Sequence, residues 1–140
     1  MIPLPSIWMI RLSLLYLLIS VILGAILLTN KALVLYPSIW VILPIHYELV
    51  IWGWLVQFVM GTAYWMFPKY LKQVKRGSVT LAWLMIVTFN IGLYILILSL
   101  ILRINGIIRI SGRSLLMLSV IIFGLLMWRR IVSYRELKTR

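Results

Sequence analysis

The uncharged stretch LSLLYLLISVILGAILLTN occupies residues 12–30 and lies between Arg11 and Lys31. An ionised side chain in the hydrocarbon of a bilayer costs at least about 2.5 kcal/mol, so charged residues mark the limits of a membrane span. A helix rises about 1.5 Å per residue, and a stretch of this length matches the ~30 Å of hydrocarbon in a bilayer. The stretch therefore predicts a transmembrane helix.

Three more uncharged stretches follow, and they run from Leu49 to Pro68, from Gly77 to Leu102 and from Ser114 to Trp128. The last is short, but its flanking arginines can snorkel and lengthen the span. Residues 32–43 are too short to cross a membrane and contain Pro37, so we interpret them as an interfacial connection with one or two helical turns. The sequence thus predicts a single all-α domain over residues 1–140, an integral membrane four-helix bundle with spans at about 8–29, 45–67, 79–102 and 111–132.

The composition supports a membrane protein and argues against catalysis. Apolar residues make up 64% of the chain, charged residues only 11%, and the mean hydropathy is +1.12. A soluble domain of this size needs far more polar surface. Cysteine and aspartate are absent, histidine occurs once and glutamate twice. These residues leave too few ligands for a self-sufficient metal centre and almost no general acid or base, so we expect no enzymatic activity.

The basic residues predict the orientation and the partners. Of the 14 lysines and arginines, 10 lie on the side of the termini, and the net charge is +12. The positive-inside rule then places both termini in the cytoplasm, and we expect a multi-pass protein of the prokaryotic cytoplasmic (inner) membrane. Such a charge on so apolar a chain indicates anionic lipids rather than nucleic acid. We expect the cationic tail from Arg129 to Arg140 to face anionic lipid or an acidic partner surface.

Polar side chains within the spans indicate where helices pack. Gln57 and Asn90 lie at matching depths on consecutive antiparallel spans, so we predict that they face the same seam. Either they bond to each other, or each is satisfied separately within the bundle. Gly53 and Gly61 share one helix face and should let another helix approach closely, and Gly92 and Gly124 are candidates for the same role.

His46 is the residue with the widest chemical range. It lies in the first turn of the second span, and Gly53 lies two turns below it on the same helix face. A glycine there leaves room for a flat macrocycle, which would suit an axial ligand of haem b or of a chlorin magnesium. The alternative is an ordinary interfacial histidine. Trp52 and Trp54 either flank a bound ring or pack against neighbouring helices. His46, Gly53 and Trp54 are thus the cofactor-binding candidates, and His46 is the metal-ligand candidate.

The segment over residues 46–69 resembles the second transmembrane helix of haem-copper oxidase subunit I. The resemblance is strongest to the C-type oxidase and nitric oxide reductase branch and to short four-helix proteins that share its pattern. The matching residues are His46, Gly53 with Trp54, Gly61, and the run from Tyr64 to Lys69. Residues 82–93 also resemble the third helix of the short proteins.

In the family, the matching histidine is an axial ligand of the low-spin haem, so the resemblance implies that role for His46. The full subunit has many more helices, and the later ones carry its second haem ligand and its copper-binding histidines. Because His46 is the only histidine of this sequence, the resemblance implies ancestry and setting without oxygen or nitric oxide reduction.

Three functions follow from these observations. The leading one is an accessory, structural transmembrane subunit of a larger energy-converting electron-transfer complex, respiratory or photosynthetic, whose partners are other membrane subunits. The second is an electron-transfer subunit in which His46 binds haem b or a chlorin. The last is a small transporter or channel lined by Gln57, Asn90 and Glu48, which ranks lowest because the sequence shows no paired charges within the spans and no inverted repeat.

Overall fold

The computed structural model describes residues 2–34, 36–67, 78–104 and 106–138. The described residues form helices and no strands, which confirms the all-α prediction. Four helices are long and apolar enough to cross a membrane. They are α1 (Leu4–Leu33), a continuous helix over Pro37–Met66 that we call helix II, α4 (Val79–Ile101) and α5 (Gly106–Lys138).

Helix II changes its winding along its length. It begins as the 3-10 helix η1 (Pro37–Ile42), continues as α2 (Leu43–Glu48), widens into the π-helix η2 (Leu49–Val56) and ends as α3 (Gln57–Met66). A π turn takes one residue more than an α turn. The buried residues accordingly recur at intervals of four through the widened part, at Ile45, Leu49, Gly53 and Gln57.

The one or two helical turns predicted between the first two spans are confirmed as the 3-10 helix η1. This helix is continuous with α2, so helix II begins at Pro37 rather than near residue 45. Pro37 and Pro44 fall in the first turns of η1 and α2, where a missing backbone N–H breaks no helical hydrogen bond. Asn30 closes the turn, because its backbone carbonyl accepts from Val34 N–H at 2.8 Å and its side-chain oxygen accepts from Tyr36 N–H at 2.9 Å.

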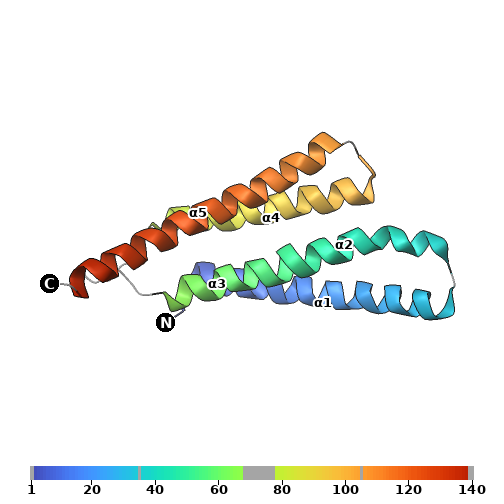
Figure 1. Ribbon diagram of the computed structural model, residues 1–140, viewed down its shortest axis with the longest axis horizontal. Coiled ribbons are helices and arrows are strands. Elements are labelled where there is room, and N and C mark those ends of the chain that lie inside the picture. Colours follow the sequence, from blue (N-terminus) through green and yellow to red (C-terminus); the bar gives the residue numbers. More distant parts are fainter. Residues whose placement is uncertain (1, 35, 68–77, 105, 139–140) are drawn as a thin grey trace.

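The helices form two hairpins that lie side by side (Figure 1). α1 packs against helix II, and α4 packs against α5, while α4 also contacts both helices of the first hairpin. The two ends of the chain lie at the same end of the bundle, which we call the terminal end; the opposite end, where each hairpin turns, is the turn end (Figure 1). Residues 68–77, with the predicted basic connection from Lys69 to Arg76, lie outside the described residues.

The core positions follow a seven-residue repeat, which is the signature of helices that wrap around each other with a left-handed twist. Along α1, three serines recur at intervals of seven residues on the buried face. The buried positions that follow the repeat are Ser6, Met9, Ser13, Tyr16, Ser20, Leu27 and Asn30 on α1, and Ala82, Met85, Phe89, Gly92, Leu96 and Ser99 on α4; Pro5, Ile86, Asn90 and Leu93 are buried beside them. Many of these side chains are small, so the helix axes approach closely.

Glycines set the closest approach within each hairpin. A Cβ atom on Gly112 would lie 2.9 Å from the backbone nitrogen of Leu96, and one on Gly92 would lie 2.9 Å from the carbonyl oxygen of Gly112. In the first hairpin, a Cβ on Gly61 would lie 2.9 Å from the Cβ of Met9. The close-packing roles predicted for Gly61 and Gly92 are therefore confirmed, whereas Gly124 has no described atom within 4 Å of its Cβ position.

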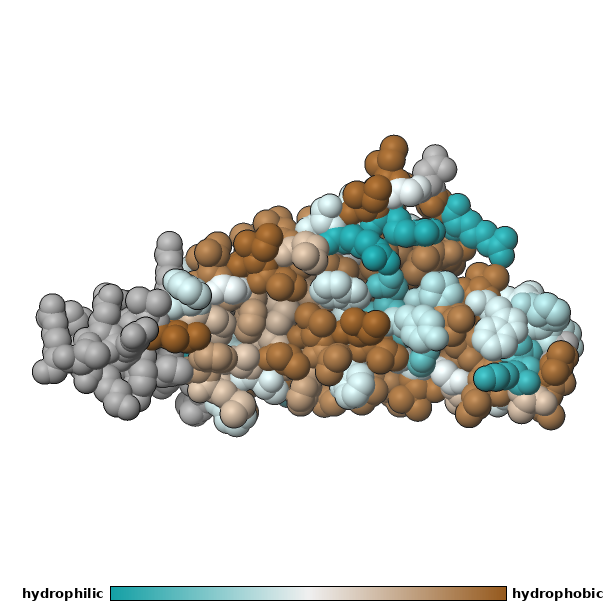
Figure 2. Space-filling view, in the orientation of Figure 1, coloured by the Kyte–Doolittle hydropathy of each residue, from teal (hydrophilic) through white to brown (hydrophobic). Residues whose placement is uncertain are grey.

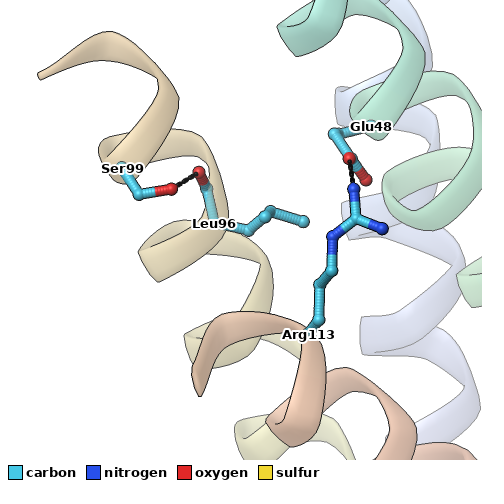
Figure 3. Close-up of polar contacts among 4 residues, drawn as sticks. All are labelled: Glu48, Leu96, Ser99 and Arg113. Atoms are coloured by element: carbon cyan, nitrogen blue, oxygen red, sulfur yellow. Dashed lines mark hydrogen bonds and ion pairs between the residues drawn. The ribbon is translucent and has the colours of Figure 1, made fainter. Parts of the chain in front are cut away.

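Among the described residues, three polar contacts join the two hairpins at different depths. Near the turn end, Arg113 of α5 donates to the carboxylate of Glu48 at 2.7 Å. Figure 3 shows the Arg113 side chain reaching from α5 to Glu48 on α2, beside α4, where Ser99 donates to the Leu96 carbonyl. This ion pair joins the last residue of α2 to a residue in the early turns of α5, and no local sequence pattern predicted it.

The second and third contacts lie deeper in the bundle and at its terminal end. Tyr16 of α1 donates its hydroxyl to Asn90 of α4 at 2.8 Å. Arg130 of α5 is 0% exposed and donates to the backbone carbonyls of Tyr64, at 3.0 Å, and of Phe67. The expectation that the tail from Arg129 to Arg140 faces anionic lipid or an acidic partner surface stays a prediction, but Arg130 itself points inward and donates to carbonyls at the end of α3.

Candidate functional site

His46 lies near the turn end, on the side of α2 that faces α1. Its ring packs over Gly24, where an added Cβ would lie 2.9 Å from the His46 Cε1 atom. The Nδ1 atom of His46 lies 2.9 Å from the backbone carbonyl oxygen of Ser20 and 3.2 Å from the Ser20 hydroxyl. A carbonyl oxygen can only accept a hydrogen bond, so Nδ1 is the donor in this contact and Nε2 is the nitrogen left for a ligand.

A histidine held through Nδ1 has the tautomer that metal ligands use, so the space around the ring decides what it can bind. Gly24 is already covered by the His46 ring itself. Gly53 is covered by Tyr16, whose Cβ and Cγ atoms would both lie 3.0 Å from an added Cβ. The room that we predicted beside Gly53 for a macrocycle is therefore filled by a side chain of α1. These residues, as packed, do not fit a haem or chlorin laid against that face of helix II.

The tryptophans of helix II differ in their surroundings. The ring of Trp52 lies 6.5 Å from the ring of Phe89 on α4, with the two planes tilted by 53°. This contact is ordinary packing between the hairpins, one of the two alternatives considered for Trp52. Trp54 is half-buried on the same helix. Both residues belong to the π-helical part of helix II, a type of winding that the sequence pattern did not indicate.

Asn90 takes its hydrogen bonds from elements other than helix II. Its Oδ1 atom accepts from the Tyr16 hydroxyl at 2.8 Å, and its Nδ2 group donates to the Ile86 carbonyl at 2.9 Å. A hydrogen bond between Asn90 and Gln57 is therefore the wrong alternative, and Asn90 is satisfied separately. The sequence analysis did not identify Tyr16 as the partner of Asn90. The available signal was a tyrosine in the middle of one span and a glycine on a neighbouring helix, because a glycine leaves room for the tyrosine ring to extend to a third helix.

Gln57 is 0% exposed, and neither of its two amide heteroatoms has a hydrogen-bond partner among the described residues. A buried polar group without a partner costs about 1–3 kcal/mol. Gln57 lies where the π-helical part of helix II ends and α3 begins. The carboxamide is thus a destabilising feature of the chain in isolation.

Replacement of Gln57 by leucine, which has a similar size, is expected to raise the free energy of unfolding by about 1–3 kcal/mol because the unpaired amide is removed. The thermal midpoint in a fixed detergent measures this effect. The matched control is Asn90→Leu, which should lower the midpoint because it removes the acceptor of the Tyr16 hydroxyl. A midpoint that falls for Gln57→Leu would show that the amide has a stabilising partner.

Comparisons of the chain with protein-family models, with curated proteins and with solved structures found no match. The resemblance to haem-copper oxidase subunit I therefore stays a prediction. The candidate residues are nevertheless placed: His46 and Ser20 form one polar contact between α1 and helix II, and Tyr16 and Asn90 form another between α1 and α4.

Proposed function

We propose that this chain is an accessory, structural transmembrane subunit that packs sideways against other subunits of a larger membrane complex. We further propose that the complex is an energy-converting electron-transfer assembly, respiratory or photosynthetic. The first part is supported by the surface and interior of the bundle. The second part is supported by the resemblance of residues 46–69 to the second helix of haem-copper oxidase subunit I.

The observation that carries the first part is the distribution of apolar side chains. All four helices expose large hydrophobic residues along their lengths, and most of the visible face is hydrophobic (Figure 2). Inside the bundle, the spaces beside Gly53, Gly61, Gly92 and Gly112 are filled by neighbouring helices. In the described part of the chain, the surface available to other molecules in the membrane is therefore the outer apolar surface of the helices, rather than an internal cavity.

The terminal half of α5 is the face that we assign to a partner helix. Gly124 has no described atom within 4 Å of its Cβ position, and Leu125 and Trp128 beside it are exposed. Glycine costs about 1 kcal/mol relative to alanine inside a helix. In membranes, small residues are where two helices come closest. An open glycine between large exposed side chains is therefore suited to a helix from another subunit.

Purification of the tagged chain from its native membrane in mild detergent tests both parts. We expect proteins with electron-transfer cofactors to copurify, and we expect Gly124→Leu to lose them without a lower thermal midpoint. Leu98→Ile, at an exposed position of α4, is the control and should keep them. Recovery of the chain without partners would contradict the first part, and partners without electron-transfer cofactors would contradict only the second.

The alternative function, in which His46 ligates haem b or a chlorin, is tested by spectroscopy. Because the spaces beside Gly24 and Gly53 are filled, we expect no Soret band in the purified chain. His46→Ala should instead lower the free energy of unfolding by about 1–3 kcal/mol, since the hydrogen bond to the Ser20 carbonyl and the packing on Gly24 are lost. A Soret band that disappears in His46→Ala would establish ligation and overturn the structural role.

A further inference from the structure

A shallow groove of about 470 Å³ runs along the surface of α5 in its turn-end half. Its lining is apolar except at Arg113 and Ser114, and it consists of Ile110, Arg113, Ser114, Met117, Leu118 and Ile121. From Ile110 to Ile121 the helix rises about 16 Å at ~1.5 Å per residue, close to half of the ~30 Å hydrocarbon thickness. The groove thus has the length of an acyl chain within one leaflet, and its polar residues lie toward the turn end.

Two guanidinium groups lie at this end of α5, one helical turn apart. Arg113 has a side chain that is 58% exposed and donates through one nitrogen to Glu48. The Nε atom of Arg109 is buried and has no hydrogen-bond partner among the described residues. The other acidic residue of the sequence, Glu136, lies 27 residues beyond Arg109 on the same helix. Glu48 is paired with Arg113, so a single carboxylate cannot neutralise both guanidinium groups.

The depth of these arginines suits a lipid headgroup. Arg109 and Arg113 follow the start of α5 at Gly106 by less than two and a half turns. At this depth long basic side chains extend toward the headgroup layer. Figure 2 shows hydrophilic side chains gathered toward the turn end over the α4 and α5 hairpin, with hydrophobic surface on the side of the terminal end. Positive charge thus lies at the turn-end part of an apolar groove, since Arg113 lines the groove and Arg109 lies one helical turn closer to the start of α5.

We propose that this surface of α5 binds an anionic phospholipid, with its phosphate at Arg109 and Arg113 and one acyl chain in the groove. Guanidinium groups bind phosphate through paired, charge-assisted hydrogen bonds. A phosphate accepts hydrogen bonds from the Arg113 guanidinium, whose side chain is 58% exposed, and neutralises positive charge that Glu48 leaves over. An apolar helix in the same groove would do neither, which is why a lipid is the better occupant.

Native mass spectrometry of the full chain in detergent tests the proposal with phosphatidylglycerol and phosphatidylcholine of identical acyl chains. A basic side chain near an anionic headgroup is worth about 1 kcal/mol, which corresponds to about fivefold in affinity. We expect phosphatidylglycerol to bind about fivefold more tightly than phosphatidylcholine. Arg109→Gln should abolish this preference, and Arg109→Lys, which keeps the charge, should retain most of it.

Ser114→Trp tests the groove separately, because a large ring there fills the acyl-chain space without a change in charge. We expect it to weaken both lipids. Arg11→Gln, an exposed arginine of α1 near the terminal end, is the charge-matched control and should leave the preference intact. Equal binding of the two lipids by the wild-type chain, or an undiminished preference in Arg109→Gln, would overturn the proposal. A lipid-independent dimer that Ser114→Trp abolishes would also overturn it, since a helix would then occupy the groove.

Discussion

Replacement of Gly112 by alanine is expected to lower the free energy of unfolding by about 3 kcal/mol. The new Cβ atom would lie 2.9 Å from the backbone nitrogen of Leu96 and 3.0 Å from the carbonyl oxygen of Gly92. Both are main-chain atoms, so no rotation of a side chain relieves the overlap. α4 and α5 must separate, and the contacts along the whole hairpin weaken, among them the 2.7 Å hydrogen bond from Ser119 to the Met85 carbonyl.

Gly124 of the same helix provides the matched control. Its Cβ position has no described atom within 4 Å, so Gly124→Ala should leave the stability of the isolated chain unchanged or raise it by up to about 1 kcal/mol. Unfolding of both variants in the same detergent, followed by circular dichroism, measures the difference. Equal effects at the two glycines would mean that α4 and α5 do not meet at Gly112.

Loss of the Arg130 side chain is the second substitution with a large expected effect. Arg130 is completely buried, and its guanidinium donates to the carbonyls of Tyr64 and Phe67, beyond which α3 has no further turn to bond them. The guanidinium carbon also lies 5.2 Å from the centre of the Tyr64 ring, a cation–π arrangement. Arg130→Ala removes these interactions together and leaves a space between α5 and α3. We expect a loss of about 3–5 kcal/mol.

Two variants separate the stability that comes from the planar guanidinium of Arg130 from the stability that comes from its positive charge. Arg130→Lys keeps a positive charge but presents one ammonium group in place of a planar fork, so it should recover only part of the lost stability. Arg11→Ala removes an exposed arginine near the same end of the bundle and should change the stability by less than about 0.5 kcal/mol. Thermal midpoints in one detergent compare the three proteins. A loss below about 1 kcal/mol for Arg130→Ala would exclude Arg130 as a tie between the hairpins.

Gln57 and Asn90 show which properties of the buried polar residues could be predicted from the sequence alone. Their equal depth follows from counting residues along antiparallel helices, and both side chains are indeed buried. Their partners depend on how far each helix is rotated about its axis. Asn90 meets Tyr16 because Gly53 lets that ring pass, whereas Gln57 has no partner among the described residues. The π-helical part of helix II changes this rotation, and no residue pattern in the sequence predicted a π-helix there.

For the charged residues too, the position in the chain could be read from the sequence, but the interaction partner could not. Glu48 and Arg113 are 65 positions apart in the chain, so no local pattern could pair them. Arg130 belongs by sequence to a basic tail, and only the end of α3 beside it turns the residue into a buried donor. His46 was singled out because it is the one histidine, but its binding to Ser20 and its fit over Gly24 depend on the register of α1 against helix II.

The helical class and the four helices long and apolar enough to cross a membrane could be read directly from the chain. In a bilayer, an ionised group is expensive and every backbone group needs a partner within its own helix, so an uncharged run of sufficient length has one outcome. The partners of Tyr16, Gln57 and Arg130 could not be read in that way. They depend on the rotation and register of helices that are distant in the sequence. Alternative rotations and registers differ by small packing energies, and the packing of the whole bundle selects one of them.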